Sequence, residues 1–91
     1  MYFVYIIYSP TRNKKYIGYT SNLKSRLVKH KNGLTLFTRF GKPWHLIYYQ
    51  AFISQLDAKR EERFLKSGKG RERLKLLLQK TIEIWTGSEA V

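Results

Sequence analysis

The chain has 91 residues, no cysteine and a formal net charge of +12, from 18 Lys and Arg against six Asp and Glu. This length supports one domain with a modest core, and the missing cysteine excludes disulfides and thiolate metal sites. The longest apolar run, residues 2–8, is much shorter than the roughly 20 residues of a membrane span. It also lacks the features of a secretory signal, so we expect a cytoplasmic protein with no membrane partner.

The positive charge is unevenly distributed along the chain. Residues 1–56 contain nine basic residues and no acid, and all six acids follow that segment. Such an excess attracts polyanions, of which nucleic-acid backbones are the commonest. An anionic membrane surface and a merely solvated basic surface are the alternatives, but the chain shows no basic amphipathic helix with an aromatic apolar face. We therefore expect nucleic acid as the partner, bound by a monomer or a weak dimer.

The first half of the chain predicts a hairpin followed by a helix. Residues 2–8 and 15–20 are rich in β-branched and aromatic residues, and turn-forming residues separate them. Ser21 or Asn22 is then suited to cap a helix over residues 23–31. That helix carries two leucines four residues apart, which indicates one buried stripe.

The second half predicts one strand and two helices. Residues 44–52 read as the third strand. Ser54 is expected to cap a second helix that runs to about Lys66. Residues 67–70, with two glycines, are expected to break the chain before a third helix over residues 71–80.

These elements predict an α+β domain with a small, mainly antiparallel, three-stranded sheet flanked by helices. The expected order is strand, strand, helix, strand, helix, helix. We expect one domain over residues 1–82 and a partly disordered tail over residues 83–91.

Several side chains that could act on a phosphate fall in the hairpin and first helix. The hairpin can bring Tyr5 near Tyr16, although the sequence leaves the strand register open. Gly18 inside a strand lowers stability unless a phosphate or another backbone must approach it. Arg26 and His30 are four residues apart on one helix face, where they could hold one phosphate. Since residues 1–56 contain no carboxylate, an acidic two-metal cluster cannot form there.

In their order and spacing, these features resemble the GIY-YIG nuclease superfamily. Tyr16-Ile17-Gly18 matches the second triplet of that motif, and Phe3-Val4-Tyr5 stands at the first triplet, with Phe3 in place of glycine. Residues 20–26 and His30 resemble the continuation into the family's catalytic helix. Residues 58–63 resemble the later segment that supplies a metal-binding glutamate. The resemblance spans about residues 2–78 and is closest to small stand-alone members related to the excinuclease nuclease domain.

The resemblance implies a catalytic set of Tyr5, Tyr16, Arg26, His30 and Glu62. It favours Glu62 over the adjacent Glu61 as the ligand of one Mg²⁺ or Mn²⁺ ion. Either tyrosine would orient or deprotonate the attacking water, with Arg26 favouring the phenolate. Phosphates flanking the cleaved bond would lie against six further residues. These are Lys15, Gly18, Lys24, Lys29, Arg39 and Lys42.

The expected activity is therefore metal-dependent, structure-directed or nonspecific endonucleolytic cleavage, with DNA the favoured substrate and a repair role only an analogy. One alternative is a non-catalytic nucleic-acid-binding module, because residues 67–78 lack an asparagine that several family nucleases carry. A second alternative is a small RNA-binding or ribosome-associated protein, in which the catalytic set need not converge.

Overall fold

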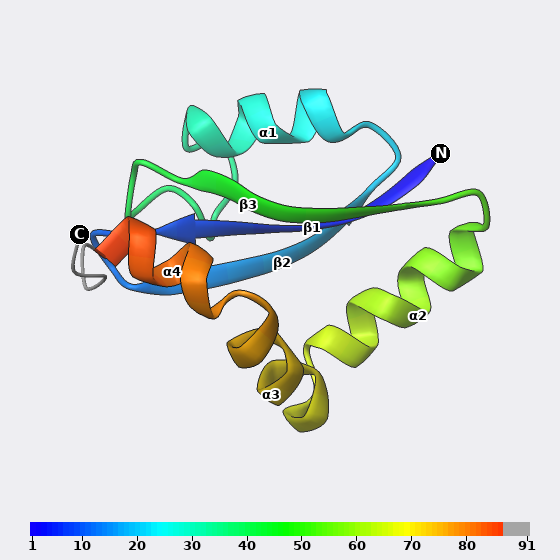
Figure 1. Ribbon diagram of the computed structural model, residues 1–91. Helices are drawn as coiled ribbons and strands as arrows, with labels where there is room; N and C mark the ends of the chain where they lie inside the picture. The colour runs from blue at the N-terminus through cyan, green and yellow to red at the C-terminus, as the bar shows by residue number, and fades with distance from the viewer. Residues whose placement is uncertain (87–91) are drawn as a thin grey trace.

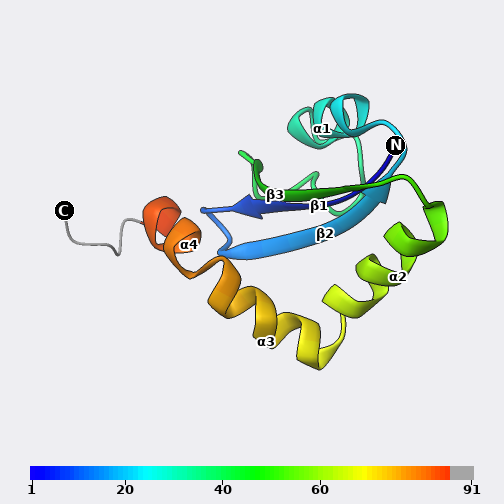
Figure 2. The same ribbon diagram turned by 45° about the vertical axis from the view of Figure 1, so that its right-hand side comes forward.

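The computed structural model describes residues 1–86, which form three strands and four helices. The elements are β1 (Tyr2–Ser9), β2 (Lys14–Thr20), α1 (Leu23–Lys31), β3 (His45–Phe52), α2 (Gln55–Leu65), α3 (Gly68–Leu77) and α4 (Gln79–Thr86). Both strand pairings are antiparallel, and the strand order is β2-β1-β3. Helix α1 covers one face of the sheet, and α2, α3 and α4 lie on the other (Figures 1 and 2). The predicted α+β fold is confirmed, with one more helix than expected.

The central strand β1 separates two apolar clusters. Val4 and Ile6 pack on the side of α2 and α3 against Leu65 and other residues of that cluster. Tyr5 and Ile7 point to the opposite side, where they belong to a cluster that includes α1 residues. All four β1 side chains are at most 1% exposed. Full burial of such side chains stabilises a fold by roughly 1.5–3 kcal/mol each, so β1 anchors both layers.

The hairpin register, which the sequence left open, places Tyr5 opposite Gly18 and Ile7 opposite Tyr16. The turn between the two strands is fastened by the Tyr8 hydroxyl, which donates to Asn13 Oδ1 at 2.7 Å. Asn13 takes φ 51° there, a conformation that asparagine adopts more readily than most residues. Tyr5 and Tyr16 therefore lie on the same face of neighbouring strands.

Two helix caps agree with the sequence. Asn22, rather than Ser21, caps α1, and its side chain accepts a hydrogen bond from the Ser25 amide at 3.0 Å. Ser54 caps α2 and accepts from the Asp57 amide at 3.2 Å. Each cap satisfies one of the amides that a helix start leaves unpaired.

The predicted break between the second and third helices is present, but it is shorter than residues 67–70, because α2 ends at Leu65 and α3 already begins at Gly68. Ser67 is its N-cap and accepts from the Gly70 amide at 3.3 Å. Gly70 lies against the end of α2, where an added Cβ would stand 2.0 Å from the Phe64 carbonyl oxygen. This glycine therefore allows two helices to meet closely, instead of ending regular structure.

Helix α4 was not predicted, and it crosses the boundary expected between residues 82 and 83. Trp85 stacks on His45 at the start of β3, with ring centroids 4.0 Å apart. Residues 87–91 of the expected tail lie outside the described part of the chain, and the division into domain and tail stays a prediction. Among residues 1–86, no helix is both long enough and apolar enough to cross a bilayer.

Candidate active site

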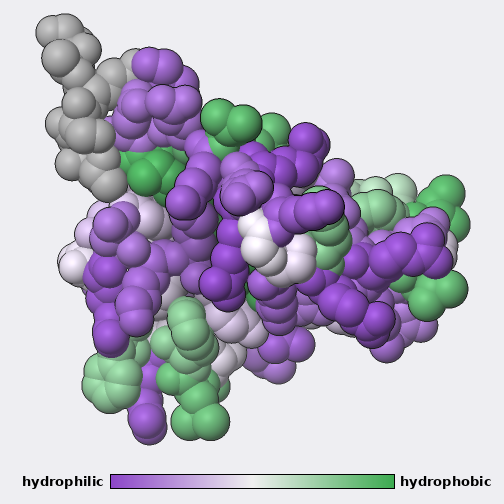
Figure 3. All heavy atoms as spheres, turned by 90° about the horizontal axis from the view of Figure 1, so that it is seen from below, coloured by the Kyte–Doolittle hydropathy of each residue, from purple (hydrophilic) through white to green (hydrophobic). Residues whose placement is uncertain are grey.

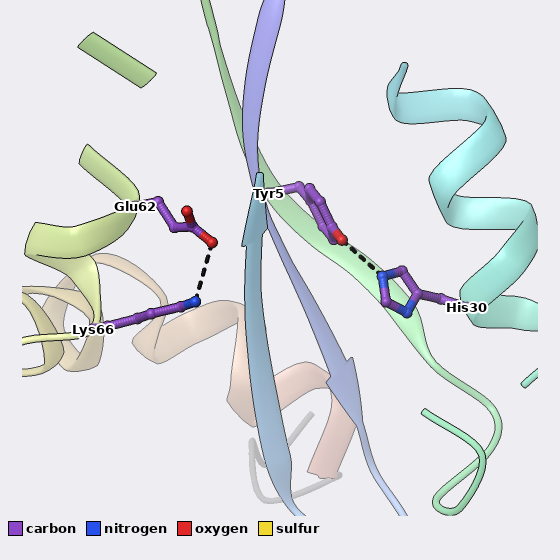
Figure 4. A network of polar contacts seen from close by, with 4 residues as sticks. All are labelled: Tyr5, His30, Glu62 and Lys66. Atoms are coloured by element: carbon purple, nitrogen blue, oxygen red, sulfur yellow. Dashed lines mark hydrogen bonds and ion pairs between the residues drawn. The ribbon is translucent and has the colours of Figure 1, made fainter. Parts of the chain in front are cut away.

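A buried tyrosine and a buried histidine meet between the sheet and α1. Tyr5 points from β1 toward α1, and its hydroxyl oxygen lies 2.7 Å from His30 Nε2 (Figure 4). Both side chains are 1% exposed. On the far side of the ring, His30 Nδ1 lies 3.1 Å from Thr38 Oγ1. The histidine is therefore held through both of its nitrogens, with one partner on β1 and one on the segment that follows α1.

Burial sets the protonation states of this pair. Burial, followed by the charge of Tyr16, raises the pKa of Tyr5 well above its usual value, and the positive charge of Arg26 opposes this only partly. Burial, followed by the charge of Arg26, lowers the pKa of His30 to about 4. Both groups are therefore neutral at pH 7. This corrects the expectation that Arg26 would favour a phenolate at Tyr5.

The lowered pKa of His30 links stability to pH. An unfolded chain binds a proton at His30 near pH 6.5, whereas the folded chain does so only near pH 4. The contribution is thus complete above pH 6.5 and is lost as the pH falls toward 4, by up to about 3 kcal/mol. Urea unfolding at pH 7 and pH 4.5 should show this loss in the parent protein. Because His30→Gln removes the titrating ring, that variant should lose less between the two pH values, and an equal loss would contradict the assignment.

Gly18 explains how the Tyr5 ring fits. A Cβ added at Gly18 would lie 2.4 Å from both Cζ and the hydroxyl oxygen of Tyr5. The sequence predicted that a phosphate or another backbone approaches this glycine, but the structure places the Tyr5 phenol directly over it. Whether nucleic acid also contacts Gly18 stays a prediction.

Replacing Gly18 with alanine should lower the free energy of unfolding by about 1–3 kcal/mol, because a fully packed ring must shift. The same shift should separate Tyr5 from His30. Urea unfolding measures the first effect, and the NMR shifts of the His30 ring report the second. Gly68→Ala is the matched control, because no atom lies within 4 Å of its added Cβ. That variant should be neutral or slightly stabilising, and an equal loss in both variants would contradict the packing explanation.

Tyr16 lies at the border between this buried pair and solvent. Its ring is half-buried, with its centroid 5.0 Å from that of His30 and 4.9 Å from that of Phe37. Arg26, on the first turns of α1, is also half-buried. Its charge acts on both Tyr5 and His30. A phenol and a guanidinium thus stand where a solvent-borne phosphate could reach them.

Glu62 approaches from the other face of the sheet. It belongs to α2, and the edge strand β2 passes between it and Tyr5 in Figure 4. One Glu62 oxygen lies 3.0 Å from Lys66 Nζ, and the two side chains are 24% and 52% exposed. Glu62 is nonetheless close enough for its charge to raise the pKa of Tyr5, whereas Glu61 acts on Tyr48 of β3. The two adjacent carboxylates therefore face different strands. Glu62 faces toward Tyr5 of β1, and Glu61 faces toward Tyr48 of β3.

A pocket at the open edge of β2 connects the two faces. Its volume is about 530 Å³. It is lined by Lys15, Tyr16, Ile17, Phe37, Lys66, Arg71, Leu74 and Lys75. Tyr16 reaches it from the α1 side, and Lys66, the ion-pair partner of Glu62, reaches it from the α2 side. Of the catalytic candidates, Tyr16 lines this cavity directly, and Glu62 adjoins it only through its ion-pair partner Lys66.

The basic residues predicted to hold flanking phosphates do not form one group. Lys15 lines the pocket at β2, and Lys24 lines a separate pocket at the start of α1. Lys29 is exposed on α1. Arg39 lies over the Phe40 ring at 5.2 Å, and Lys42 lies beside Gly33.

The sequence did not point to the three basic pocket residues from the second half of the chain, Lys66, Arg71 and Lys75. The available signals were the four-residue spacings from Glu62 to Lys66 and from Arg71 to Lys75, which place such pairs on one helix face. It also missed the role of Thr38, which only the fold brings to His30.

Glu62 is a lone candidate ligand. Within residues 1–86, no three His, Asp or Glu side chains gather closely enough to hold a metal ion together. A single carboxylate nonetheless suits Mg²⁺, which keeps several waters and often binds through one or two carboxylates plus substrate phosphates. Glu62 is partly exposed and its lysine partner is more so, so the carboxylate can be reached from solvent. A hydrated divalent ion at Glu62 would take the place of Lys66 as the partner of the carboxylate.

The chain is similar to known proteins in both sequence and fold. Residues 1–75 match the GIY-YIG catalytic domain, and the chain belongs to that family. It is 40% identical to a UPF0213 protein of Pediococcus acidilactici over 80% of this chain and 78% of that one. It is 31% identical to a UPF0213 protein of Clostridium perfringens over 91% and 89%. The solution NMR structure of a UPF0213 protein from Bacillus halodurans superposes with a TM-score of 0.52, at 33% identity and 85% coverage of each chain.

Proposed function

We propose that this protein is a divalent-metal-dependent endonuclease that hydrolyses nucleic-acid phosphodiesters, with DNA as the favoured substrate. One observation carries the proposal: Tyr16 and Lys66, the partner of Glu62, line the same cavity at the β2 edge. A phosphate in that cavity can meet a phenol from one face of the sheet and approach a carboxylate from the other. Family membership and the net charge of +12 support the same reaction class.

Hydrolysis adds a water oxygen to phosphorus and breaks one ester P–O bond. The site must therefore orient and deprotonate the water, stabilise the growing negative charge, and hold the metal ion. The Tyr16 oxygen orients the attacking water and accepts its proton in the phenolate form, while the leaving oxygen takes its proton from solvent water. The Arg26 guanidinium stabilises charge that grows on the non-bridging oxygens. Glu62 would hold the divalent ion, which supplies charge neutralisation at the phosphate and the leaving oxygen when bound.

Tyr5 and His30 have a different role in this scheme. Both are buried and neutral at pH 7, and both nitrogens of His30 have partners. We therefore assign them as positioning residues that hold the Tyr16 ring in place from its buried side. The helix spacing had predicted that His30 and Arg26 could hold one phosphate, but a fully buried, neutral ring is poorly suited to hold an anion.

The proposal is tested with the purified protein and end-labelled single-stranded, duplex and branched DNA, in Mg²⁺ or Mn²⁺. The expected result is cleavage that requires the metal and stops when a chelator is added. Salt-sensitive binding without cleavage of any substrate would contradict the enzyme and favour the non-catalytic module. A matched RNA strand in the same series tests whether RNA is cleaved as well.

A further inference from the structure

The pocket at the β2 edge gathers cations from three separate segments. Lys15 comes from β2, Lys66 follows the last turn of α2, and Arg71 and Lys75 lie one turn apart on α3. The charged lining residues that the structure describes are all positive. Across the face formed by α2, α3 and α4, hydrophilic side chains predominate, and hydrophobic patches lie toward its rim (Figure 3). Lys66 is paired with Glu62, and an anion in the pocket would relieve the mutual repulsion of the other three cations.

The same pocket also presents an aromatic surface. Phe37 is 50% exposed, although a phenyl ring is usually buried. Its ring is held in place by contacts with Tyr16 at 4.9 Å and Trp44 at 5.7 Å between centroids. A fixed, exposed ring beside several cations is the pattern on which proteins stack an unpaired base while they hold its backbone. Phosphate alone would not require Phe37.

We propose that this pocket binds one unpaired nucleotide of the substrate strand, next to the phosphodiester that is cleaved. The base lies against Phe37, and the flanking phosphates lie against Lys15, Arg71 and Lys75. The volume of about 530 Å³ is within the range of pockets that hold small molecules. This inference rests on the proposed function for the position of the cleaved bond beside Tyr16.

A pocket for an unpaired nucleotide selects nucleic acids that have unpaired bases. A base inside a continuous duplex is stacked on both sides and cannot lie on a protein ring unless it is extruded. The enzyme should therefore prefer strands with at least one unpaired nucleotide at the cleavage position, as in single strands, flaps and gaps. Continuous duplex would engage only the basic surface.

Binding in chelator-containing buffer tests the inference without cleavage. A labelled single strand should bind at least about ten-fold more tightly than a duplex of the same sequence. Phe37→Ala should weaken single-strand binding by about five-fold or more, the lower end for a base stacked on an aromatic ring, and should leave duplex binding unchanged. Phe40→Ala is the matched control, since Phe40 is 59% exposed on the same segment but does not line this pocket.

A charge-matched pair provides a second readout. Arg71→Ala with Lys75→Ala should weaken single-strand binding by at least about ten-fold. Lys69→Ala with Arg73→Ala removes the same charge from the same helix outside the pocket, so it should have a much smaller effect. Circular dichroism melts confirm that each variant is folded.

A strand with one abasic position distinguishes this inference from the proposed function. Moving the abasic site along the strand should reveal one position where binding to the parent protein drops, and Phe37→Ala should remove that drop. Equal effects of Phe37→Ala and Phe40→Ala, or duplex binding as tight as single-strand binding, would overturn the pocket assignment even if metal-dependent cleavage is found. Base-dependent binding without any cleavage would uphold the pocket and remove the nuclease proposal.

Discussion

Replacing Glu62 with glutamine should reduce metal-dependent cleavage by at least about a hundred-fold. Glutamine keeps the shape of the side chain but removes the negative charge that a hard divalent cation requires. The charge neutralisation lost with the metal is several kcal/mol in the transition state, which corresponds to a factor of this size or more. The Glu62–Lys66 ion pair is partly exposed, so its loss should change stability by only about 0–1 kcal/mol.

Glu61→Gln is the control for this variant. It makes the same chemical change one residue earlier, but Glu61 acts on Tyr48 of β3 and not on Tyr5. The experiment measures initial cleavage rates against Mg²⁺ concentration and Mn²⁺ binding to each protein. We expect weakened Mn²⁺ binding and lost cleavage only for Glu62→Gln. Cleavage at the parent rate by Glu62→Gln would remove this residue from the metal site, and a loss of cleavage confined to Glu61→Gln would transfer the role.

The elements that the sequence predicted are those with local signals. The β-branched and aromatic runs of the strands, the Ser54 cap and the leucine spacing of α1 are each signals within a few residues, and the predicted elements all appear in the structure. Gly70 misled the prediction because a glycine required for close contact between helices looks the same in sequence as one that ends a helix. Helix α4 was missed because nothing local marks Trp85 as the partner of His45, 40 positions earlier.

The same distinction between local and long-range signals applies to the candidate site. Motif spacing was enough to name Tyr5 and Tyr16 together, but not to tell which is buried, since that depends on the pairing of Tyr5 with Gly18 across the hairpin. Glu62 could be named, but not its approach from the opposite face of the sheet. The pocket at the β2 edge depends on three segments meeting in space, and no spacing along the chain encodes that.

The difference between the two tyrosines leads to opposite expectations for the same substitution. Tyr16→Phe removes the hydroxyl of a side chain that lines the cavity, so it should lower kcat by about 10²–10⁴-fold, the usual range for a lost acid-base group. DNA affinity and the free energy of unfolding should change little, because the ring and its contacts with Phe37 and His30 remain. Single-turnover cleavage rates and binding measured in chelator separate these effects.

Tyr5→Phe should instead act mainly on stability. It leaves His30 Nε2 without its partner in a site that is 1% exposed, and an unpaired buried polar atom is destabilising by about 1–3 kcal/mol. Its cleavage rate, measured where the variant is fully folded, should exceed that of Tyr16→Phe by at least about ten-fold, since Tyr5 supports the site without touching the phosphate. The reverse order of rates, with Tyr5→Phe the slower enzyme, would show that the buried phenol takes part in the chemistry and that Tyr16 does not carry it alone.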